Sequence, residues 1–325
     1  MTQQTRFSRE ALAIDAPSAV ERITTAVREQ VTSRLKRRGA VVAVSGGIDS
    51  SVVLALCARA LGPGRVLALF LPERDSSPDS ERLGRLLASQ LGVEGITEDI
   101  TPALEAVRCY ARRDEAVKEV IPEYGPGWRC KIVLPGVTDS DRYRLFSVVA
   151  RSPDGREVRE RLTLGAYLGI VAATNFKQRV RKMLEYHHAD RRNFAVAGTP
   201  NRLEYDQGFF VKLGDGAADV KPIAHLYKSQ VYQVAEALGV PEEIRRRPPT
   251  TDTYSLAQSQ EEFYFSLPYA EMDLCLYARD HQIAPSEVAE ALGRTPIEIE
   301  RVFRDIDSKR AVARGLLMAP LRVDD

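Results

Sequence analysis

The residues best suited to chemistry in this chain lie at Ser45–Ser51, with the sequence SGGIDSS. This segment follows an apolar run, Ala40–Val44, and leads into a predicted helix at Asp49–Leu61. Adjacent glycines let the backbone approach a ligand closely, and the N–H groups at a helix start favour phosphate. The carboxylate of Asp49 would repel that phosphate unless it holds a cation such as Mg²⁺. A plain glycine turn with an aspartate cap is the simpler alternative, but the whole pattern predicts a pyrophosphate and magnesium site. It matches neither the Walker A motif nor GxGxxG.

Glu204 ends a second motif, Gly198–Glu204, which follows a predicted strand at Asn193–Gly198. Ligands of a parallel sheet bind at the carboxyl ends of its strands, so we expect Glu204 and Asp49 to lie at one edge. Two carboxylates from two strand ends are suited to a hard cation. Taken alone, Glu204 is more typical of a surface charge, and only the first loop favours a role in metal binding.

The loop Lys212–Pro222 combines small residues with Asp215 and Asp219, so its backbone can approach a polar ligand. A solvated acidic loop explains the same residues equally well. Lys228 lies near the start of a predicted helix, where a positive charge opposes the helix dipole. This position indicates an anionic partner for Lys228.

Short apolar strands alternate with helices along most of the chain, which predicts a parallel α/β sheet covered on both faces. Residues 17–38 carry apolar side chains every three or four positions, as an amphipathic helix does. We expect strands at 40–44, 65–71, 95–100 and 193–198, and helices at 49–61, 79–91, 166–190, 226–238 and 241–246.

Residues 122–165 interrupt this alternation with glycines, prolines and three β-like stretches, at 129–134, 142–151 and 156–164. The turn Ser152–Gly155 has proline and glycine where a β-turn needs them. We therefore predict a small antiparallel meander inserted into the α/β domain. The tail is expected to form helices at 268–281, 285–292 and 296–314. The expected domains are 1–265, with the insertion 122–165, and a helical C-terminal extension, 266–325.

The composition of the 325 residues excludes several classes of protein. Lys plus Arg number 46 and Asp plus Glu 45, so a net charge of +1 gives no bulk attraction to nucleic acids or membranes. No apolar run approaches the roughly 20 residues of a membrane span, and the first residues do not resemble a secretory signal. The widely spaced Cys57, Cys109, Cys130 and Cys275 are expected to be free thiols of a cytoplasmic protein.

The order of its motifs makes the sequence resemble the NAD synthetases, which are ammonia-transferring N-type ATP pyrophosphatases of the PP-loop superfamily. The resemblance covers roughly residues 15–120 and 165–265. It implies a Rossmann-like, doubly wound parallel sheet of the adenine nucleotide alpha hydrolase kind. The motifs that carry it are Ser45–Ser51, Asn175–Arg181, Gly198–Glu204, Gly208–Asp219, Leu238–Ile244 and Pro248–Asp252.

The resemblance implies a ligase reaction. ATP activates the carboxylate of deamido-NAD (nicotinate adenine dinucleotide) as an acyl-adenylate, and ammonia then displaces AMP to give NAD. It also implies a homodimer whose acyl site spans two subunits. The helix 166–190 is the candidate contact because its apolar positions exceed what one face needs, although the same side chains would serve equally well as core. The resemblance places ATP at Ser45, Gly46, Gly47, Asp49, Ser50, Ser51, Thr199, Lys228 and Thr250. It places Mg²⁺ at Asp49 and Glu204. It places the acyl substrate at Asn175, Arg179, Lys212, Asp215 and Asp219. Asp49 and Lys228 are the expected catalytic residues of the ATP site, and Asp215 or Asp219 is expected to accept a proton from ammonium.

The chain departs from the family pattern in the extra meander, in residues 251–262 and in the longer tail. A paralogue that adenylates and amidates a different carboxylate is therefore the main alternative. A tRNA-thiolating pyrophosphatase lacks support, since there is no CxxC pair and no basic patch. A binding module without turnover fits poorly with the retention of Asp49 and Glu204. Free ammonia is the simplest nitrogen donor, and a separate glutaminase remains an alternative.

Overall fold

The computed structural model describes residues 7–134, 146–249, 253–256, 258–259, 264–265 and 267–323. Its main sheet is parallel, with the strand order β3-β2-β1-β7. Ala40 of β1 pairs with Val66 on one side and with Ala195 on the other. The strands are β1 (Ala40–Ala43), β2 (Val66–Phe70), β3 (Glu94–Thr97) and β7 (Ala195–Ala197). The predicted parallel α/β sheet is confirmed, with strands slightly shorter than expected.

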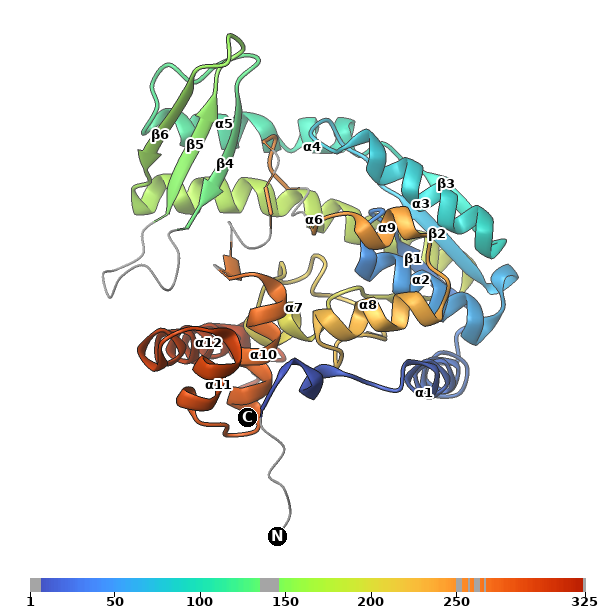
Figure 1. Ribbon diagram of the computed structural model, residues 1–325. Helices are drawn as coiled ribbons and strands as arrows, with labels where there is room; N and C mark the ends of the chain where they lie inside the picture. The colour runs from blue at the N-terminus through green and yellow to red at the C-terminus, as the bar shows by residue number, and fades with distance from the viewer. Residues whose placement is uncertain are drawn as a thin grey trace.

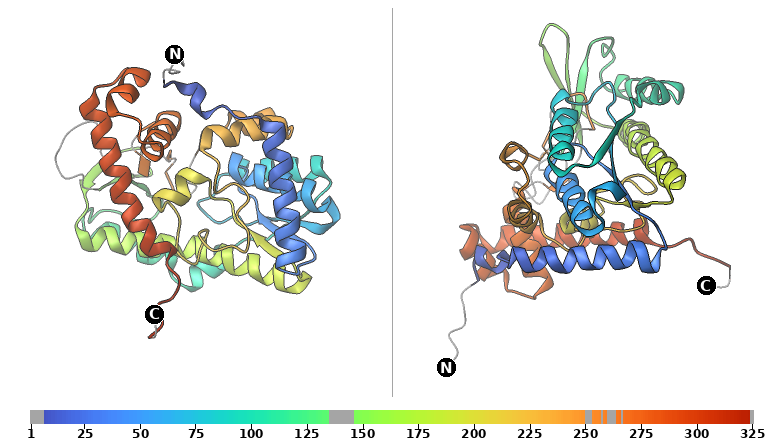
Figure 2. Two further views of the ribbon diagram at one scale, coloured as in Figure 1. Left: turned by 90° about the horizontal axis from the view of Figure 1, so that it is seen from below. Right: turned by 90° about the vertical axis from the view of Figure 1, so that its right-hand side faces the viewer.

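Helices cover both faces of this sheet because its strands bury side chains on both sides. Val42 packs into the core that contains α1, α2, α3, α8 and α9, whereas Val41 packs into the opposite core with α4 and α6. Figures 1 and 2 show these two helical layers. Their bounds are α1 (Ala16–Arg28), α2 (Ile48–Leu61), α3 (Pro78–Leu91), α4 (Thr101–Ala106), α6 (Leu164–Arg192), α8 (Lys228–Ala237) and α9 (Glu242–Arg246).

The predicted meander is also confirmed, as an antiparallel sheet of order β4-β5-β6. It packs on α5 (Cys109–Lys118) and on the first half of α6, around a core that includes Ile132 and Val148. Figure 1 shows α6 running from beneath this sheet to the parallel sheet. The strands are β4 (Arg129–Val133), β5 (Ser147–Arg151) and β6 (Glu157–Arg161). Residues 142–145 of the second predicted strand lie outside the described residues.

The predicted C-terminal helices form, as α10 (Tyr269–Asp280), α11 (Pro285–Leu292) and α12 (Pro296–Leu317). They share a hydrophobic cluster with Phe7 and Leu12 near the N-terminus. Figures 1 and 2 show that the N-terminal segment runs beside these helices before it reaches α1. The cluster also contains Leu203 and Tyr227. The C-terminal helices are therefore joined to the rest of the chain by buried contacts, and the division at residue 266 remains a prediction.

Three features differ from the sequence-based expectation. The first helix changes at Glu29 into a π-helical stretch, Glu29–Arg34. Helices α4 and α5 are separated by Arg108 in the left-handed conformation (φ 57°), and their short length hides any apolar repeat. Helix α7 (Arg202–Gln207) begins within the Gly198–Glu204 motif, where no helix was predicted, and a reciprocal cap between Asn201 and Glu204 starts it. Within the described part of the chain, none of the helices is long and apolar enough to cross a bilayer.

Candidate active site

A cavity of about 570 Å³ opens at the carboxyl ends of β1, β2 and β7. The loops after these three strands supply its lining, through Ser45, Pro72 and Gly198 among others. Helix α6 and the start of α8 add to the wall. The cavity therefore lies where ligands of open parallel sheets bind.

The loop after β1 is folded as a cradle that leads into α2. Ser50 Oγ accepts the N–H of Ser45 at 3.2 Å and donates to the carbonyl of Gly47 at 3.1 Å. Gly46 has φ +68°, and a Cβ there would lie 2.4 Å from the carbonyl oxygen of Ser80. Only glycine fits this position, and the loop then leads into the first turn of α2, whose residues line the cavity and whose N–H groups have no partner within the helix.

Asp49, in the first turn of α2, lies at the centre of a charged cluster. Its Oδ2 forms an ion pair with Lys228 Nζ, and its Oδ1 accepts from Asn201 Nδ2 at 3.0 Å. Asn201 also caps α7, because its side chain accepts the N–H of Glu204 while Glu204 Oε2 accepts the N–H of Asn201. The cap holds Glu204 on the same cavity wall. The cluster therefore presents two carboxylates and one ammonium at the cradle.

The side chain of Lys228 is 1% exposed. Burial alone would lower its pKa, but the nearby carboxylates of Asp49 and Glu204 outweigh burial and raise it. Lys228 therefore stays charged at neutral pH and is available to neutralise an anion. Its backbone N–H, at the start of α8, donates to Asp273 Oδ1 of α10 at 3.2 Å. The C-terminal helices thus help to fix the helix that carries Lys228.

Asp273 provides a prediction about pH. Burial raises its pKa from 3.8 to about 6 despite bonds from Ser229 and Lys228. The folded chain therefore binds this proton more tightly than the unfolded chain, and the stabilisation is lost as pH rises through about 6. Between pH 4.5 and 7.5 the wild type should lose about 2 kcal/mol of unfolding free energy through this group, a loss that Asp273→Asn lacks. Urea unfolding at both pH values measures it, and equal pH dependence in the two proteins would contradict it.

The part of the cavity next to α6 also carries buried charges. Lys182 Nζ binds Glu185 Oε2 at 2.6 Å, and both side chains are almost fully buried. Asp215 lines the same region and accepts the N–H of Val211 at 2.8 Å. Burial raises the pKa of both Glu185 and Asp215 above the usual range of a carboxyl group. Such groups hold a proton more readily than exposed carboxylates do.

The cavity brings most of the predicted site residues together. Ser45, Gly47, Asp49, Ser50, Thr199, Lys228, Asn175, Asp215 and Glu204 all line it. Five separate segments of the sequence thus converge on one space, and Asp49 and Glu204 lie at one edge of the sheet, as the carboxyl-edge argument predicted. The functional role of each residue remains a prediction.

Other predicted residues lie elsewhere among the described residues. Gly46 belongs to the cradle and packs against the carbonyl of Ser80. Ser51 is buried in α2, with no hydrogen-bond partner for its hydroxyl in the described chain. Arg179 is exposed and donates to the carbonyl of Lys212 at 3.3 Å. The carboxylate of Asp219 accepts the N–H of Val196 in β7 at 2.7 Å. Thr250 lies outside the described residues.

Sequence reasoning missed Arg247, which lines the cavity close to the cradle. Its guanidinium donates to Ser80 Oγ at 3.0 Å and to the carbonyl of Ser45 at 3.5 Å. A run of three arginines before Pro248 was the available signal, but nothing in the run distinguishes Arg247 from its neighbours. The Lys182–Glu185 pair was missed as well, because an i,i+3 ion pair on a helix is usually exposed.

Together, the parallel sheet and its cradle define a nucleotide-binding α/β protein of the PP-loop type. Comparison with known proteins agrees, and this chain belongs to the NAD synthase family, whose sequence model matches residues 19–122 and 161–312. Between these two stretches the match leaves out residues 123–160, which include β4 and β5.

Two curated relatives are similar over nearly their whole length. The NH3-dependent NAD(+) synthetase of Mesorhizobium japonicum is 60% identical over 95% of this chain and 97% of its own. That of Rhizobium rhizogenes is 58% identical over 98% and 96%. Two solved structures support the fold. NMN synthetase from Francisella tularensis has a TM-score of 0.65 and 20% identity, and the match covers 96% of this chain and all of that one. NH3-dependent NAD synthetase from Campylobacter jejuni has a TM-score of 0.61 and 23% identity, and the match covers 95% of this chain and 100% of that one.

Proposed function

We propose that this protein is a C–N ligase that amidates deamido-NAD with ammonia and ATP, giving NAD, AMP and pyrophosphate. Membership of the NAD synthase family and the identity to NH3-dependent NAD(+) synthetases support this reaction. The structural observation that carries it is the cradle after β1, with the Asp49–Lys228 pair beside it in one cavity. A carboxylate becomes a useful electrophile once it is joined to AMP, which is a good leaving group.

The residues of the cradle are suited to the first step. The N–H groups at the start of α2 and the hydroxyl of Ser45 can hold phosphate oxygens, while Ser50 Oγ fixes the cradle through its bond to the carbonyl of Gly47. Lys228 would neutralise charge that develops on pyrophosphate as the acyl oxygen attacks the α-phosphorus. Arg247, on the same side of the cavity, provides a second positive charge. Positioning and charge neutralisation are the main demands of this step.

Asp49 and Glu204 fit a magnesium ion. Both line the cavity, and both lie close enough to Lys228 to raise its pKa. No cluster of three His, Cys, Asp or Glu side chains suited to a metal occurs among the described residues. Mg²⁺ commonly uses one or two carboxylates together with substrate phosphates and water. When bound, it would supply further neutralisation of phosphate charge.

Asp215 is suited to the second step. The ammonia nitrogen bonds to the acyl carbon, the bond from that carbon to AMP breaks, and the nitrogen loses its extra proton. Burial raises the pKa of Asp215, which lines the cavity, so we assign its carboxylate as the proton acceptor. Asp219, the other candidate, is not part of the cavity lining in the described chain, and it accepts a backbone N–H of β7.

A homodimer is the proposed assembly, with α6 at the contact. Leu164, Leu168 and Met183 of this helix are 73%, 54% and 59% exposed. Leu164 and Leu168 lie one helical turn apart, and exposed apolar side chains that adjoin one another indicate an interaction surface. The change Leu168→Glu should shift the sedimentation mass from dimer to monomer. A monomeric wild type at micromolar concentration would contradict this assembly.

The cytoplasm remains the expected location, consistent with four free, buried cysteines.

A direct assay tests the reaction. The protein is incubated with ATP, Mg²⁺, ammonium and deamido-NAD, and AMP and NAD are followed by chromatography. We expect equal amounts of both products, and none when glutamine replaces ammonium. A requirement for glutamine and an added glutaminase would favour a separate glutaminase as the source of the ammonia. Nicotinate mononucleotide is the matched alternative acid, and AMP formed only with that acid would favour a paralogue.

A further inference from the structure

Two segments far apart in the sequence form one side of the cavity. The loop Glu73–Ser77 follows β2, and its Ser76 and Ser77 line the cavity. Thr253 and Tyr254 follow α9 and line it as well. The two segments are nearly 180 residues apart, so their common position requires a link.

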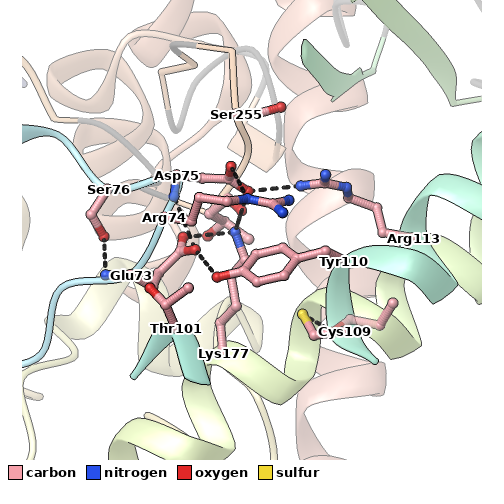
Figure 3. A network of polar contacts seen from close by, with 12 residues as sticks. Glu73, Arg74, Asp75, Ser76, Thr101, Cys109, Tyr110, Arg113, Lys177 and Ser255 are labelled. Atoms are coloured by element: carbon pink, nitrogen blue, oxygen red, sulfur yellow. Dashed lines mark hydrogen bonds and ion pairs between the residues drawn. The ribbon is translucent and has the colours of Figure 1, made fainter. Parts of the chain in front are cut away.

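Lys177 of α6 provides that link. Its side chain is fully buried, and its Nζ donates to Glu73 Oε1 at 2.7 Å, Asp75 Oδ2 at 3.0 Å and the carbonyl oxygen of Thr253 at 2.9 Å. An ammonium group has three N–H donors, and all three are used. Figure 3 shows Lys177 rising from α6 between the two carboxylates.

Helix α5 holds the same two carboxylates from the other side. Tyr110 donates to Glu73 Oε2 at 2.7 Å, and Arg113 Nη1 binds Asp75 Oδ2 at 2.7 Å. Burial alone would raise the pKa of Asp75, but Lys177 and Arg113 outweigh burial and lower it. The buried Glu73 and Asp75 thus face two buried cations, Lys177 and Arg113 (Figure 3). Two more exposed groups extend the network, because Arg74 pairs with Asp75 and Asp114 pairs with Arg113, and the charges balance.

Such a network is an expensive way to gain stability. Removing four charged groups from water costs several kcal/mol for each ion, and apolar side chains often stabilise equally well. What the ions add is a fixed orientation of the groups, because each N–H donor and each oxygen acceptor requires a particular hydrogen-bond geometry. The network therefore indicates a need to fix the loop after β2 and the carbonyl of Thr253 in one arrangement.

The segment after Thr253 is attached to the meander. Ser255 Oγ accepts the N–H of Cys130 at 2.9 Å, Leu256 N–H donates to the carbonyl of Cys130 at 3.2 Å, and Gln258 Nε2 donates to the carbonyl of Ile132. Cys130 and Ile132 belong to β4, an edge strand of the three-stranded sheet. Tyr254 is buried in the core of the meander. The segment therefore lies along a sheet edge, which offers unpaired backbone groups to a neighbouring chain.

We propose that Lys177 is a positioning residue, and that Lys177 and strand β4 together hold Thr253 and Tyr254 as a wall of the ATP cavity. This assigns a role to the meander, part of which lies outside the family match: it is a fixed support for a segment that contacts substrate. The proposal rests on the proposed function for its kinetic consequence, but not for its structural one.

Two variants test the proposal. Lys177→Met combined with Glu73→Gln removes one charge of each sign and cuts the link. Ser255→Ala combined with Gln258→Leu leaves the ionic network intact and weakens the attachment to β4. We expect KM for ATP to rise at least tenfold in the first and at least threefold in the second, with kcat changed less than threefold. In both, the amide of Leu256 should exchange with deuterium at least tenfold faster.

Arg294→Met is the matched control. It breaks a partly buried ion pair with Glu271, and neither residue lines the cavity. It should leave both KM and the exchange of Leu256 unchanged. Unchanged exchange in the Ser255/Gln258 variant, or an equal rise in KM in the control, would overturn the proposal. A wild type that releases no AMP would instead contradict the proposed function, and the exchange measurement would still decide the positioning role.

Discussion

Asp49→Asn is expected to lower kcat/KM for ATP-dependent AMP release by a factor of about 10³ or more, equivalent to about 4 kcal/mol of transition-state stabilisation. The amide keeps the size of the side chain but removes the negative charge that pairs with Lys228. It also removes one of the two carboxylates proposed for Mg²⁺. Steady-state measurement of AMP at saturating ammonium gives the ratio.

Asp79→Asn is the matched control for this variant. Asp79 occupies the second position of α3, as Asp49 does in α2, and it also pairs with a basic side chain, Arg82. It does not contribute to the lining of the cavity among the described residues. The control should keep AMP release within a factor of two. Full activity of Asp49→Asn would show that this carboxylate has no part in the reaction.

Lys228→Met should abolish detectable AMP release and lower the free energy of unfolding by about 3–5 kcal/mol. The change removes the buried partner of Asp49 and leaves that carboxylate, together with Glu204, without its cation. Urea unfolding measures the stability, and product chromatography measures the activity.

The double variant Asp49→Asn/Lys228→Met separates these two effects. With both charges removed, it should be more stable than Lys228→Met alone by about 1–3 kcal/mol, yet equally inactive. Strictly additive losses of stability in the two single variants would contradict the ion pair. Activity regained in the double variant would contradict the role of Lys228 in neutralising phosphate.

The nucleotide cradle was predictable because its signals are contiguous. A buried strand, two glycines, an aspartate and a helix start follow one another within Ala40–Leu61, and the structure places them as expected. The second carboxylate, Glu204, was predictable from the rule that strand ends meet at one edge. The meander was visible from its turn residues and β-like stretches.

The contacts that position these groups could not be predicted in the same way. Lys177 and Glu73 are separated by 104 residues, and Asp273 reaches the start of α8 from 45 residues away. Neither contact produces a periodic or local pattern in the sequence, because each depends on how two folded secondary-structure elements pack against each other. The use of β4 as a support for Ser255 and Gln258 likewise requires the folded sheet. For the same reason, the sequence did not distinguish Arg247 from the adjacent arginines.

A crystal structure of the protein with a non-hydrolysable ATP analogue and Mn²⁺ tests the central assignment most directly. Anomalous scattering locates the metal independently of the nucleotide. The account predicts phosphate oxygens on the N–H groups between Ser45 and Ser50, with Mn²⁺ bound by Asp49 and Glu204. A nucleotide bound away from the loop after β1, or a metal held by other side chains, would contradict it.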